Sequence, residues 1–316
     1  MSKTLVTGAG GFLGSAISRA LLARGEEVVA LDCAAAASRL NLLVETPGCI
    51  SVLCDITDGD AVDAVFAQHH PTAVIHCASI VGVLASLSAP IHLMRVNVEG
   101  SINLFESMAR HNCARVIHLS SEEIYGSFLA ERIDENHREA PLHAYGISKA
   151  AVEHLGRSYR ETHGTECINI RTSWVYGPGF LRDRLPMNMI RAAAECRPLH
   201  VPFGAAERID YTYLDDAVDG VLGAYFCSKH EYDAYHISSD SAPSLAEIAE
   251  ILSELAPGTE ISVGPGRYRH GGNAAIPKKG ALSCDRARTA FGYVPKFDIR
   301  AGLEATLAAE RALQAH

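Results

Sequence analysis

The sequence predicts an α/β fold: a parallel, doubly wound sheet with a smaller C-terminal lobe. Short apolar runs alternate with segments whose apolar residues recur at helical spacing. Strands are expected at residues 4–7, 27–31, 50–56, 73–79, 115–119 and 167–171. Strands that alternate with helices favour parallel pairing, so these runs indicate one sheet covered by helices.

The regular alternation ends after residue 171, where turn-rich sequence begins with Trp174-Val175-Tyr176-Gly177-Pro178-Gly179. We therefore expect a first domain over residues 1–172, with returning segments at about 209–240. Residues 173–208 and 241–316 should form the smaller lobe. A cleft between two such lobes is the usual place for a small-molecule substrate.

Composition limits the classes of partner. Of the 316 residues, 48% are hydrophobic and 21% are charged, which is ordinary for a globular protein. The formal net charge of −9 argues against nucleic acid or an anionic membrane as the main partner, and no apolar run is long enough to span a bilayer. The nine cysteines are scattered without CxxC or zinc-site spacing, so we expect no metal site and reduced thiols in the cytoplasm.

A glycine-rich turn follows the first strand. Gly8, Gly11 and Gly14 have the spacing GxxGxxG at the start of a predicted helix. Gly8 permits a tight turn, Gly11 lets the backbone approach a pyrophosphate, and Gly14 allows close packing of the helix. The pattern predicts a dinucleotide site of the Rossmann type, with Phe12 and Leu13 of the same turn among its contacts.

The ends of the next three strands refine the cofactor. Asp32 ends the second strand, where a carboxylate accepts from the adenosine ribose and repels a 2′-phosphate, so NAD is expected rather than NADP. Arg39 is close enough in sequence to oppose that preference. Asp55 ends the third strand within reach of an adenine amino group. In the fourth strand we interpret His76 as structural and the small Ala78 as a place where the cofactor approaches closely.

Two further motifs carry groups that exchange protons with a hydroxyl. Tyr145 and Lys149 stand one turn apart on a predicted helix, and the ammonium brings the phenol nearer to a working pKa. Ser121 follows the buried strand at 115–119 and can donate to an oxygen on which charge changes. Together these groups can move a proton on or off a sugar or alcohol oxygen. That is half of a hydride transfer, and a nicotinamide supplies the other half.

Eight motifs in this order make the chain resemble an extended short-chain dehydrogenase/reductase of the NAD-dependent epimerase/dehydratase family over nearly its whole length. They are Thr7-Gly8-x-x-Gly11-x-x-Gly14, Asp55-Ile56, His76-x-Ala78, Asn97-Val98-x-Gly100, Ser120-Ser121-x-x-Ile124-Tyr125-Gly126, Tyr145-x-x-x-Lys149, Tyr176-Gly177-Pro178 and Asp215-Asp216. The resemblance implies an NAD-binding first domain, a substrate-binding second lobe, and a homodimer joined through helices next to the tyrosine.

The same resemblance implies roles for single residues. Tyr145 is the expected acid/base, and Lys149 is expected to bind the nicotinamide ribose and assist the phenol. Ser121 matches the family's catalytic hydroxyl residue. Ile56 and Asn97 join the expected cofactor contacts through their motifs.

The pair Glu122-Glu123 leaves the reaction open. Simple 4-epimerases of the family usually carry small or hydroxyl residues here, whereas relatives that eliminate water carry Asp or Ser followed by Glu, and sugar-acid decarboxylases also carry Glu. Two carboxylates beside a ketone can serve as acid and base, with Glu123 the stronger catalytic candidate. In the alternative interpretation both are surface charges of a loop.

Two departures from the family pattern concern the substrate. Nucleotide-sugar enzymes usually carry Asn where Trp174 stands, and Arg directly before the Asp-aromatic pair, where this chain has Ile209. Arg208 is one residue off and would point to the other face of a strand. Replacement cations are Arg182, Arg184, Arg191, Arg267 and Arg269. The expected substrate contacts are Ser121, Glu122, Glu123, Trp174, Arg182, Arg208 and Arg269.

The sequence thus predicts an NAD-dependent enzyme that oxidises a sugar ring hydroxyl to a transient ketone and then returns the hydride. We favour a nucleotide-sugar 4-epimerase, since elimination needs both acids and Glu122 is longer than the Asp usual in dehydratases. The alternatives are a nucleotide-sugar 4,6-dehydratase or decarboxylase, and an NAD-dependent dehydrogenase of a free sugar or sugar acid. A non-catalytic NAD-sensing module is disfavoured by the intact Ser121, Tyr145 and Lys149.

Overall fold

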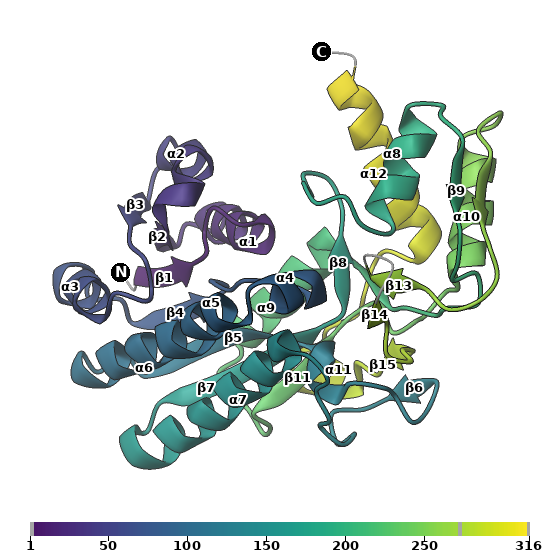
Figure 1. Cartoon of the computed structure of the whole chain (residues 1–316). Coiled ribbons are helices and arrows are strands. Elements are labelled where there is room, and N and C mark those ends of the chain that lie inside the picture. The colour runs from purple at the N-terminus through teal and green to yellow at the C-terminus, as the bar shows by residue number, and fades with distance from the viewer. Residues whose placement is uncertain (1–2, 271–273, 315–316) are drawn as a thin grey trace. The chain divides into compact units, whose positions relative to one another are not determined.

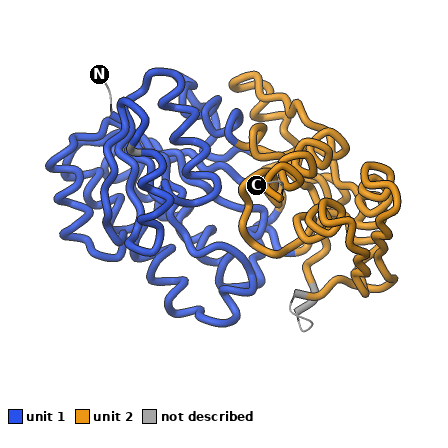
Figure 2. The backbone as a smooth tube through the Cα atoms, turned by 90° about the horizontal axis from the view of Figure 1, so that it is seen from above, with its two compact units in different colours: residues 1–126, 138–171, 218–235 blue, residues 127–137, 172–217, 236–316 orange. Residues whose placement is uncertain are grey.

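The computed structural model describes residues 3–270 and 274–314. The chain divides into two compact units, coloured blue and orange in Figure 2. Unit 1 contains residues 1–126, 138–171 and 218–235, and unit 2 contains residues 127–137, 172–217 and 236–316. Each unit is thus assembled from three separate segments of the chain. Whether the units divide the work as a cofactor domain and a substrate lobe stays a prediction.

Unit 1 is built on the predicted sheet. The strands are β1 (Lys3–Thr7), β2 (Glu27–Asp32), β3 (Cys49–Leu53), β4 (Ala73–His76), β5 (Arg115–Ser121), β7 (Glu166–Thr172) and β11 (Ala234–Ile237), in the order β11-β7-β5-β4-β1-β2-β3 (Figure 1). The strands from β3 to β5 pair in parallel, with Thr4 opposite Val28 on one side and Ala73 on the other. The strand order reverses between β1 and β4, and sheets of this kind bind ligands at the carboxyl ends beside that point. The predicted fold class is confirmed.

The helical elements of this part of the chain connect successive strands. They are α1 (Phe12–Leu22), η1 (Ala34–Ala36), α2 (Ala37–Val44), α3 (Gly59–His69), α4 (Val83–Ser88), α5 (Pro90–Met94), the π-helical turn η2 (Arg95–Glu99), α6 (Gly100–Arg110), η3 (Glu122–Tyr125), α7 (Ala144–His163) and α9 (Leu214–Phe226). Local chemistry sets two of the ends. The Asp58 carboxylate accepts from Ala61 N at the start of α3, and Gly164, with φ of 71°, ends α7.

One face of the sheet is covered by α3, α6 and α7. Phe66 of α3 and Phe105 of α6 are fully buried against Leu5 and Val74 of the sheet. Figure 1 shows α6 and α7 running side by side along this face. Because these rings lie in a close-packed layer, truncating Phe105 to alanine is expected to cost about 3–5 kcal/mol of folding free energy. This packing fixes α7, which carries the predicted acid/base pair, against the sheet.

Unit 2 contains short sheets and several helices. Its two-stranded sheets pair β8 (Trp174–Tyr176) with β10 (Tyr211–Tyr213), β9 (Leu199–Val201) with β12 (Ile261–Val263), β6 (Arg132–Ile133) with β15 (Ala281–Leu282), and β13 (Arg269–His270) with β14 (Ala274–Ala275). Its helices are α8 (Met187–Ala194), α10 (Leu245–Leu255), α11 (Asp285–Phe291) and α12 (Ile299–Gln314). Within residues 209–240, β11 joins the main sheet, whereas β10 pairs with β8. No helix in the described ranges is long and apolar enough to cross a membrane.

Candidate active site

The glycine turn after β1 excludes side chains from the space above it. Gly8 has φ of 67°, and a Cβ there would lie 2.7 Å from the backbone nitrogen of Ala78. A Cβ on Gly14 would collide with the carbonyl oxygen of Gly8, and one on Gly11 would lie 3.0 Å from the same oxygen. Phe12 and Leu13 begin α1, whose N-terminus favours an anion. The three glycines therefore let the turn, the start of α1 and the loop after β4 pack closely together, and the predicted phosphate contacts of this turn stay a prediction.

Asp32 lies beside the glycine turn, where its carboxylate supports the backbone. Its Oδ2 accepts from Gly10 N at 2.9 Å, and its Oδ1 accepts from Cys33 N at 2.8 Å. An ionised carboxylate has about four acceptor sites, so two remain for a ribose. Arg39 donates from Nε to the carbonyl oxygen of Gly10 at 2.6 Å, which brings a cation to the same turn. Asp32, which was predicted to disfavour NADP, and Arg39, which was predicted to oppose that preference, therefore both lie beside the glycine turn.

Asp55 and Ile56 have different surroundings: Asp55 is exposed, and Ile56 is buried. The exposed Asp55 accepts from the backbone N and Oγ1 of Thr57, both at 2.9 Å. Ile56 is buried against α6, where a Cβ on Gly100 would lie 2.6 Å from the Ile56 Cδ1. Asp55 is therefore the member of the pair that can reach an adenine, and Ile56 holds its loop against the helix.

Asn97, in the π-helical turn η2, forms side-chain hydrogen bonds to the loop after β4 and to α7. Its amide accepts from Ile80 N at 2.7 Å and donates to Ile80 O at 3.0 Å and to Ser148 Oγ at 2.9 Å. These bonds join the loop after β4, which contains Ala78, to α7. Asn97 can therefore shape the predicted cofactor site by holding its loop, since its own donors and acceptor are engaged by the protein.

Tyr145 and Lys149 lie at the start of α7 with their side chains buried. Lys149 Nζ donates to the carbonyl oxygen of Leu119, at the end of β5, at 2.7 Å and lies 5.9 Å from the centroid of the Tyr145 ring. Burial lowers the pKa of Lys149 to about 8, while the negative charge of Glu153 acts in the opposite direction. A cation this close to the phenol favours its ionised form. The structure therefore brings the two predicted residues together, and their exchange of protons with a substrate stays a prediction.

The end of β5 brings Ser121, Glu122 and Glu123 to the same part of unit 1. Ser121 begins the turn η3, where its Oγ accepts from Glu123 N at 3.2 Å. A Cβ on Gly146 would collide with the carbonyl oxygen of Glu123, so the glycine that follows Tyr145 lets α7 approach η3. Glu122 is 1% exposed and Glu123 is 9% exposed. Neither acid is a solvated charge on a loop, in contrast to the alternative that the sequence allowed.

A buried ionic cluster behind this site was not predicted. Glu153 is fully buried, accepts from Ser120 Oγ at 2.5 Å and pairs with Arg171 Nη2 at 2.6 Å. Arg171 also donates from Nη1 to the Tyr125 phenol at 2.7 Å. The cluster thus connects Ser120, which precedes Ser121, and Tyr125, the last residue of η3, to the helix of Lys149. The available signal was the spacing of Glu153, one turn beyond Lys149 on the same helical face.

In unit 2, Trp174 contacts Arg184, one of the five arginines that were predicted as replacement cations. The guanidinium carbon of Arg184 lies 4.9 Å from the Trp174 ring and 5.1 Å from the Phe180 ring. Tyr211 meets Trp174 edge to face, with ring centroids 5.9 Å apart. A guanidinium held against aromatic faces keeps its N–H edge directed for planar anions. Arg182 is exposed on the same loop, and its carbonyl oxygen accepts from Arg191 Nη1 at 3.2 Å.

The other predicted cations of the substrate site have different surroundings. Arg208 is half exposed and donates to Ala242 O at 3.0 Å and to the Glu247 carboxylate at 3.3 Å, beside the N-terminus of α10. Arg269 is exposed on β13. The structure therefore associates Arg184 with Trp174, whereas the guanidinium of Arg208 is held at a helix end.

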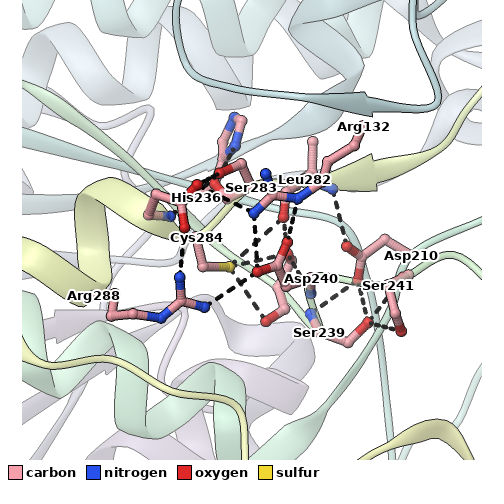
Figure 3. Close-up of polar contacts among 12 residues, drawn as sticks. Arg132, Asp210, His236, Ser239, Asp240, Ser241, Leu282, Ser283, Cys284 and Arg288 are labelled. Atoms are coloured by element: carbon pink, nitrogen blue, oxygen red, sulfur yellow. Dashed lines mark hydrogen bonds and ion pairs between the residues drawn. The ribbon is translucent and has the colours of Figure 1, made fainter.

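Asp210 follows Ile209, the residue that replaces the usual Arg of the family. It belongs to a cluster of hydrogen-bonded polar side chains in unit 2 (Figure 3). Its Oδ1 accepts from Ser239 N at 2.9 Å and Ser239 Oγ at 2.7 Å, and its Oδ2 accepts from Leu282 N at 3.1 Å. Burial raises the pKa of Asp210 to about 6, opposed by these hydrogen bonds. Asp240, in the same view, accepts from Arg132 at 2.8 Å. These carboxylates join strands and loops of unit 2.

The residues of unit 1 fit a bound dinucleotide. The glycine turn leads directly into the N-terminus of α1, which favours an anion, and Asp32 keeps acceptor capacity beside it. The buried Tyr145 and Lys149 lie on α7, which Asn97 connects to the loop after β4. By contrast, no group of three His, Cys, Asp or Glu among the described residues is arranged to hold a metal ion.

Comparison with known proteins gives a family and two reactions. A model of the NAD dependent epimerase/dehydratase family matches residues 4–237. The chain is 28% identical to the dTDP-glucose 4,6-dehydratase of Neisseria meningitidis, covering 97% of this chain and 92% of that protein. It is 27% identical to the UDP-glucuronate 4-epimerase of Thermodesulfobacterium geofontis, covering 97% and 95%. The solved UDP-glucose 4-epimerase of Thermus thermophilus, a complex with NAD, has a TM-score of 0.84 at 26% identity and covers 98% and 99%.

Proposed function

The chain belongs to the NAD-dependent epimerase/dehydratase family, and from this premise we propose that it is a nucleotide-sugar 4-epimerase. The predicted family, enzyme class and NAD cofactor are confirmed. The proposal is supported by Lys149, which is fixed to Leu119 O and lies 5.9 Å from the centroid of the Tyr145 ring. Epimerisation needs reversible proton exchange with one hydroxyl and no titrating group beyond this pair, whereas elimination needs the same pair and two further groups.

The residues of the site divide this task. Bound NAD would be held by the glycine turn and Asp32 and would supply the acceptor and donor of the hydride. Tyr145 Oη takes the proton of the ring hydroxyl and later returns it to the same oxygen, after the ketone has presented its other face to the hydride, while the Lys149 ammonium favours the phenolate. Ser121 donates to the same sugar oxygen as its charge changes. Because the proton and the hydride both return, no external acid, base or reductant is consumed.

A 4,6-dehydratase is the second candidate, favoured by the burial of Glu122 and Glu123 beside Tyr145. Elimination needs a base at C5 and an acid at the C6 oxygen, and two carboxylates in a low-dielectric place can divide those roles. We prefer epimerisation because it needs neither group. The dTDP-glucose 4,6-dehydratase and the UDP-glucuronate 4-epimerase among the relatives support both candidates.

The deciding experiment follows the C5 position. Purified protein is incubated in D₂O with UDP-glucose, UDP-glucuronate, dTDP-glucose and free glucose, and the products are analysed by NMR. We expect inversion at C4 with C5 hydrogen retained. Deuterium at C5 with a 4-keto-6-deoxy product would replace the epimerase with the dehydratase. Release of NADH with free glucose would indicate a sugar dehydrogenase instead.

Glu123 gives the matched mutational test. In an epimerase, Glu123→Gln should change turnover by less than about tenfold, since the proton that moves belongs to Tyr145. In a dehydratase the same change should stop elimination and leave the enzyme with reduced cofactor, visible by absorbance. Glu122→Gln tests the second buried carboxylate: in a dehydratase it should also impair elimination, and in an epimerase its effect should be as small as that of Glu123→Gln.

We propose a nucleotide-linked sugar as the substrate. The curated relatives act on dTDP- and UDP-sugars. In this chain, the Arg184 guanidinium between Trp174 and Phe180 supports an anionic partner such as a diphosphate or a carboxylate. The exposed cations Arg182 and Arg269 remain further candidates for contact with it.

We also propose a homodimer and a cytoplasmic location. Helices α4, α5 and α7 contact one another and expose large apolar residues, namely Leu84, Leu87, Ile91 and Ile147 at 54%, 53%, 74% and 45%. A patch of this kind marks an interaction surface, and a second copy would cover it. Ile91→Glu should convert a dimer into a monomer in sedimentation experiments. The cytoplasmic proposal rests on the scattered spacing of the nine cysteines in the sequence, which lacks a disulfide-like pattern.

A further inference from the structure

A buried set of polar side chains runs from the glycine turn of unit 1 to the helix of the acid/base pair. His76 Nδ1 lies 2.7 Å from Thr7 Oγ1, one residue before Gly8. His76 Nε2 lies 2.9 Å from Ser101 Oγ on α6. Thr7, His76 and Ser101 are each no more than 2% exposed. Polar groups buried to this degree are costly unless every one is paired, so their arrangement calls for a physical account.

The donors and acceptors of this set have one consistent direction. Ser101 Oγ donates its single proton to the carbonyl oxygen of Asn97 at 2.5 Å, so it must accept from His76 Nε2–H. A neutral imidazole protonated at Nε2 has a bare Nδ1, which accepts the Thr7 hydroxyl proton. Thr7 Oγ1 in turn accepts from Ala78 N at 3.2 Å. The hydrogen bonds thus assign the Nε2–H tautomer to His76.

The set continues from Asn97 to α7. The Asn97 amide donates to Ser148 Oγ at 2.9 Å, and Ser148 Oγ donates to the carbonyl oxygen of Tyr145 at 2.7 Å. Ser148 directly precedes Lys149 in the chain. The hydrogen-bond path Thr7, His76, Ser101, Asn97 and Ser148 therefore begins at the turn where a Cβ on Gly8 would strike Ala78, and ends between Tyr145 and Lys149.

We infer that His76 is a positioning residue that couples cofactor binding at the glycine turn to the placement of Tyr145 and Lys149. A shift of the turn moves the Thr7 hydroxyl and the Ala78 nitrogen, and His76 transmits this to α6 and the Asn97 backbone. The inference rests on the NAD site of the proposed function and is independent of which sugar is the substrate.

Electrostatics keep His76 in the form that the path needs. Burial lowers the pKa of His76 to about 3, and the positive charge of Lys149 acts in the same direction. An imidazolium would donate from both nitrogens, so it could no longer accept from Thr7. The imidazole of His118, its neighbour across the sheet with a centroid 5.8 Å away, also has a pKa well below 6.5, from burial first and then from Lys149. The path therefore stays intact throughout the neutral range.

The first test compares two serines of α6. Ser101 and Ser107 are both 1% exposed, but Ser107 Oγ has no hydrogen-bond partner in the part of the chain that the structure describes. Cofactor-free protein is titrated with NAD. Ser101→Ala should raise the Kd for NAD at least fivefold, and Ser107→Ala less than twofold. Equal effects of the two changes on the Kd would overturn the inference, because packing alone would then account for Ser101.

The second test measures the coupling between the two ends of the path. Thr7→Val and Ser148→Ala are made singly and together, and the Kd for NAD is measured for each. Each single change raises the Kd for NAD by some factor. If the path is continuous, the double variant should raise the Kd by a factor at least threefold smaller than the product of the two single factors. Independent effects that multiply would overturn the inference. A role confined to stability would lower the denaturation midpoint and leave the two changes independent in NAD binding.

His76 itself is tested by a conservative rescue. His76→Phe keeps a ring without hydrogen bonds, whereas His76→Gln keeps one donor and one acceptor. The Phe variant should weaken NAD binding at least tenfold, and the Gln variant should recover a substantial part of that loss. Equal Kd values for both variants would contradict the positioning role. A wild-type protein without NAD affinity would overturn the proposed function as well, whereas tight NAD binding without coupling would overturn only this inference.

Discussion

The predicted site residues of units 1 and 2 are held in different ways. In unit 1, Lys149 donates to Leu119 O, and the side-chain amide of Asn97 is hydrogen-bonded to Ile80 and Ser148. In unit 2, Arg184 is held by the flat faces of Trp174 and Phe180. Hydrogen bonds fix atoms to within tenths of an ångström, while ring stacking fixes a plane and allows sliding within it.

This difference matches the demands of the chemistry. A proton-transfer group must lie within hydrogen-bond reach of the reacting oxygen, so it needs an immobile backbone and a defined protonation state. A group that recognises a phosphate or carboxylate needs charge and planarity, and it tolerates small displacements. We therefore expect substitutions in unit 1 to act on turnover and cofactor binding, and those in unit 2 to act on substrate affinity.

The largest effect should come from the phenol. Tyr145→Phe should lower turnover at least about a hundredfold and leave NAD binding nearly unchanged, because the phenol acts on the proton of the substrate. Steady-state rates and an NAD titration check this. Tyr159→Phe is the matched control on the same helix, since that phenol bonds to Glu106 instead. If the Tyr145→Phe variant keeps more than about a hundredth of the rate, another group carries the proton.

A smaller, roughly tenfold effect is expected at Asp32. Its carboxylate repels a 2′-phosphate, so NAD should bind at least tenfold more tightly than NADP, about 1.4 kcal/mol. Asp32→Gly should narrow this ratio, and Arg39→Met should widen it by removing the cation at Gly10 O. Titrations of cofactor-free protein with both dinucleotides give the ratios. Equal affinities in the wild type would remove the role assigned to Asp32.

The buried imidazoles of unit 1 predict a loss of stability in acid. An unfolded His has a pKa of about 6.5, and burial lowers that of folded His76 to about 3. Below pH 6.5 the unfolded chain therefore binds a proton that the folded chain refuses. Stability from this group is complete above pH 6.5 and falls towards pH 3 by about 1.4 kcal/mol per pH unit.

Denaturant unfolding at pH 6.5 and 5.5 measures that slope. His76→Gln should reduce the loss between the two values by up to about 1.4 kcal/mol, since glutamine does not titrate. His200→Gln, at an exposed position of unit 2, is the control and should leave the slope nearly unchanged. An unchanged slope in the His76 variant would show that His76 binds a proton as readily in the folded protein as in the unfolded chain.

The sequence was informative where a local pattern carries the geometry. Gly8 and Gly14 could be predicted because only glycine fits those contacts, and Tyr145 and Lys149 because one helical turn relates them. The path through His76 and Asn97 could not be predicted, because the partners that it joins across different elements are 25 to 69 residues apart and depend on how α6 and α7 pack on the sheet.

In unit 2, prediction from the sequence was limited for a different reason. Arg184 was one of several arginines in irregular sequence, and no periodic pattern shows which arginine reaches Trp174. Arg208 was expected at the substrate because of its place beside the Asp-aromatic pair. Its guanidinium instead contacts the Glu247 side chain, which forms a capping box with Ser244. The substrate role of Arg208 stays a prediction, and its surroundings make Arg184 the stronger candidate.

The smallest expected effect sharpens the comparison within unit 2. Arg184→Lys keeps the charge but loses the planar group that lies against Trp174 and Phe180. The loss of stacking and of a paired N–H edge corresponds to about 0.5–1.5 kcal/mol, so KM for a nucleotide sugar should rise about two- to tenfold with kcat nearly unchanged. Arg208→Lys is the matched control: the half-exposed ion pair with Glu247 contributes little, and KM should change less than twofold. If the Arg208 variant shows the larger rise, the substrate anion is recognised beside α10 and the role of the Trp174 stack is confined to packing. If Arg184→Lys lowers kcat instead of raising KM, this side chain acts in the chemical step, and the contrast drawn between the two units fails.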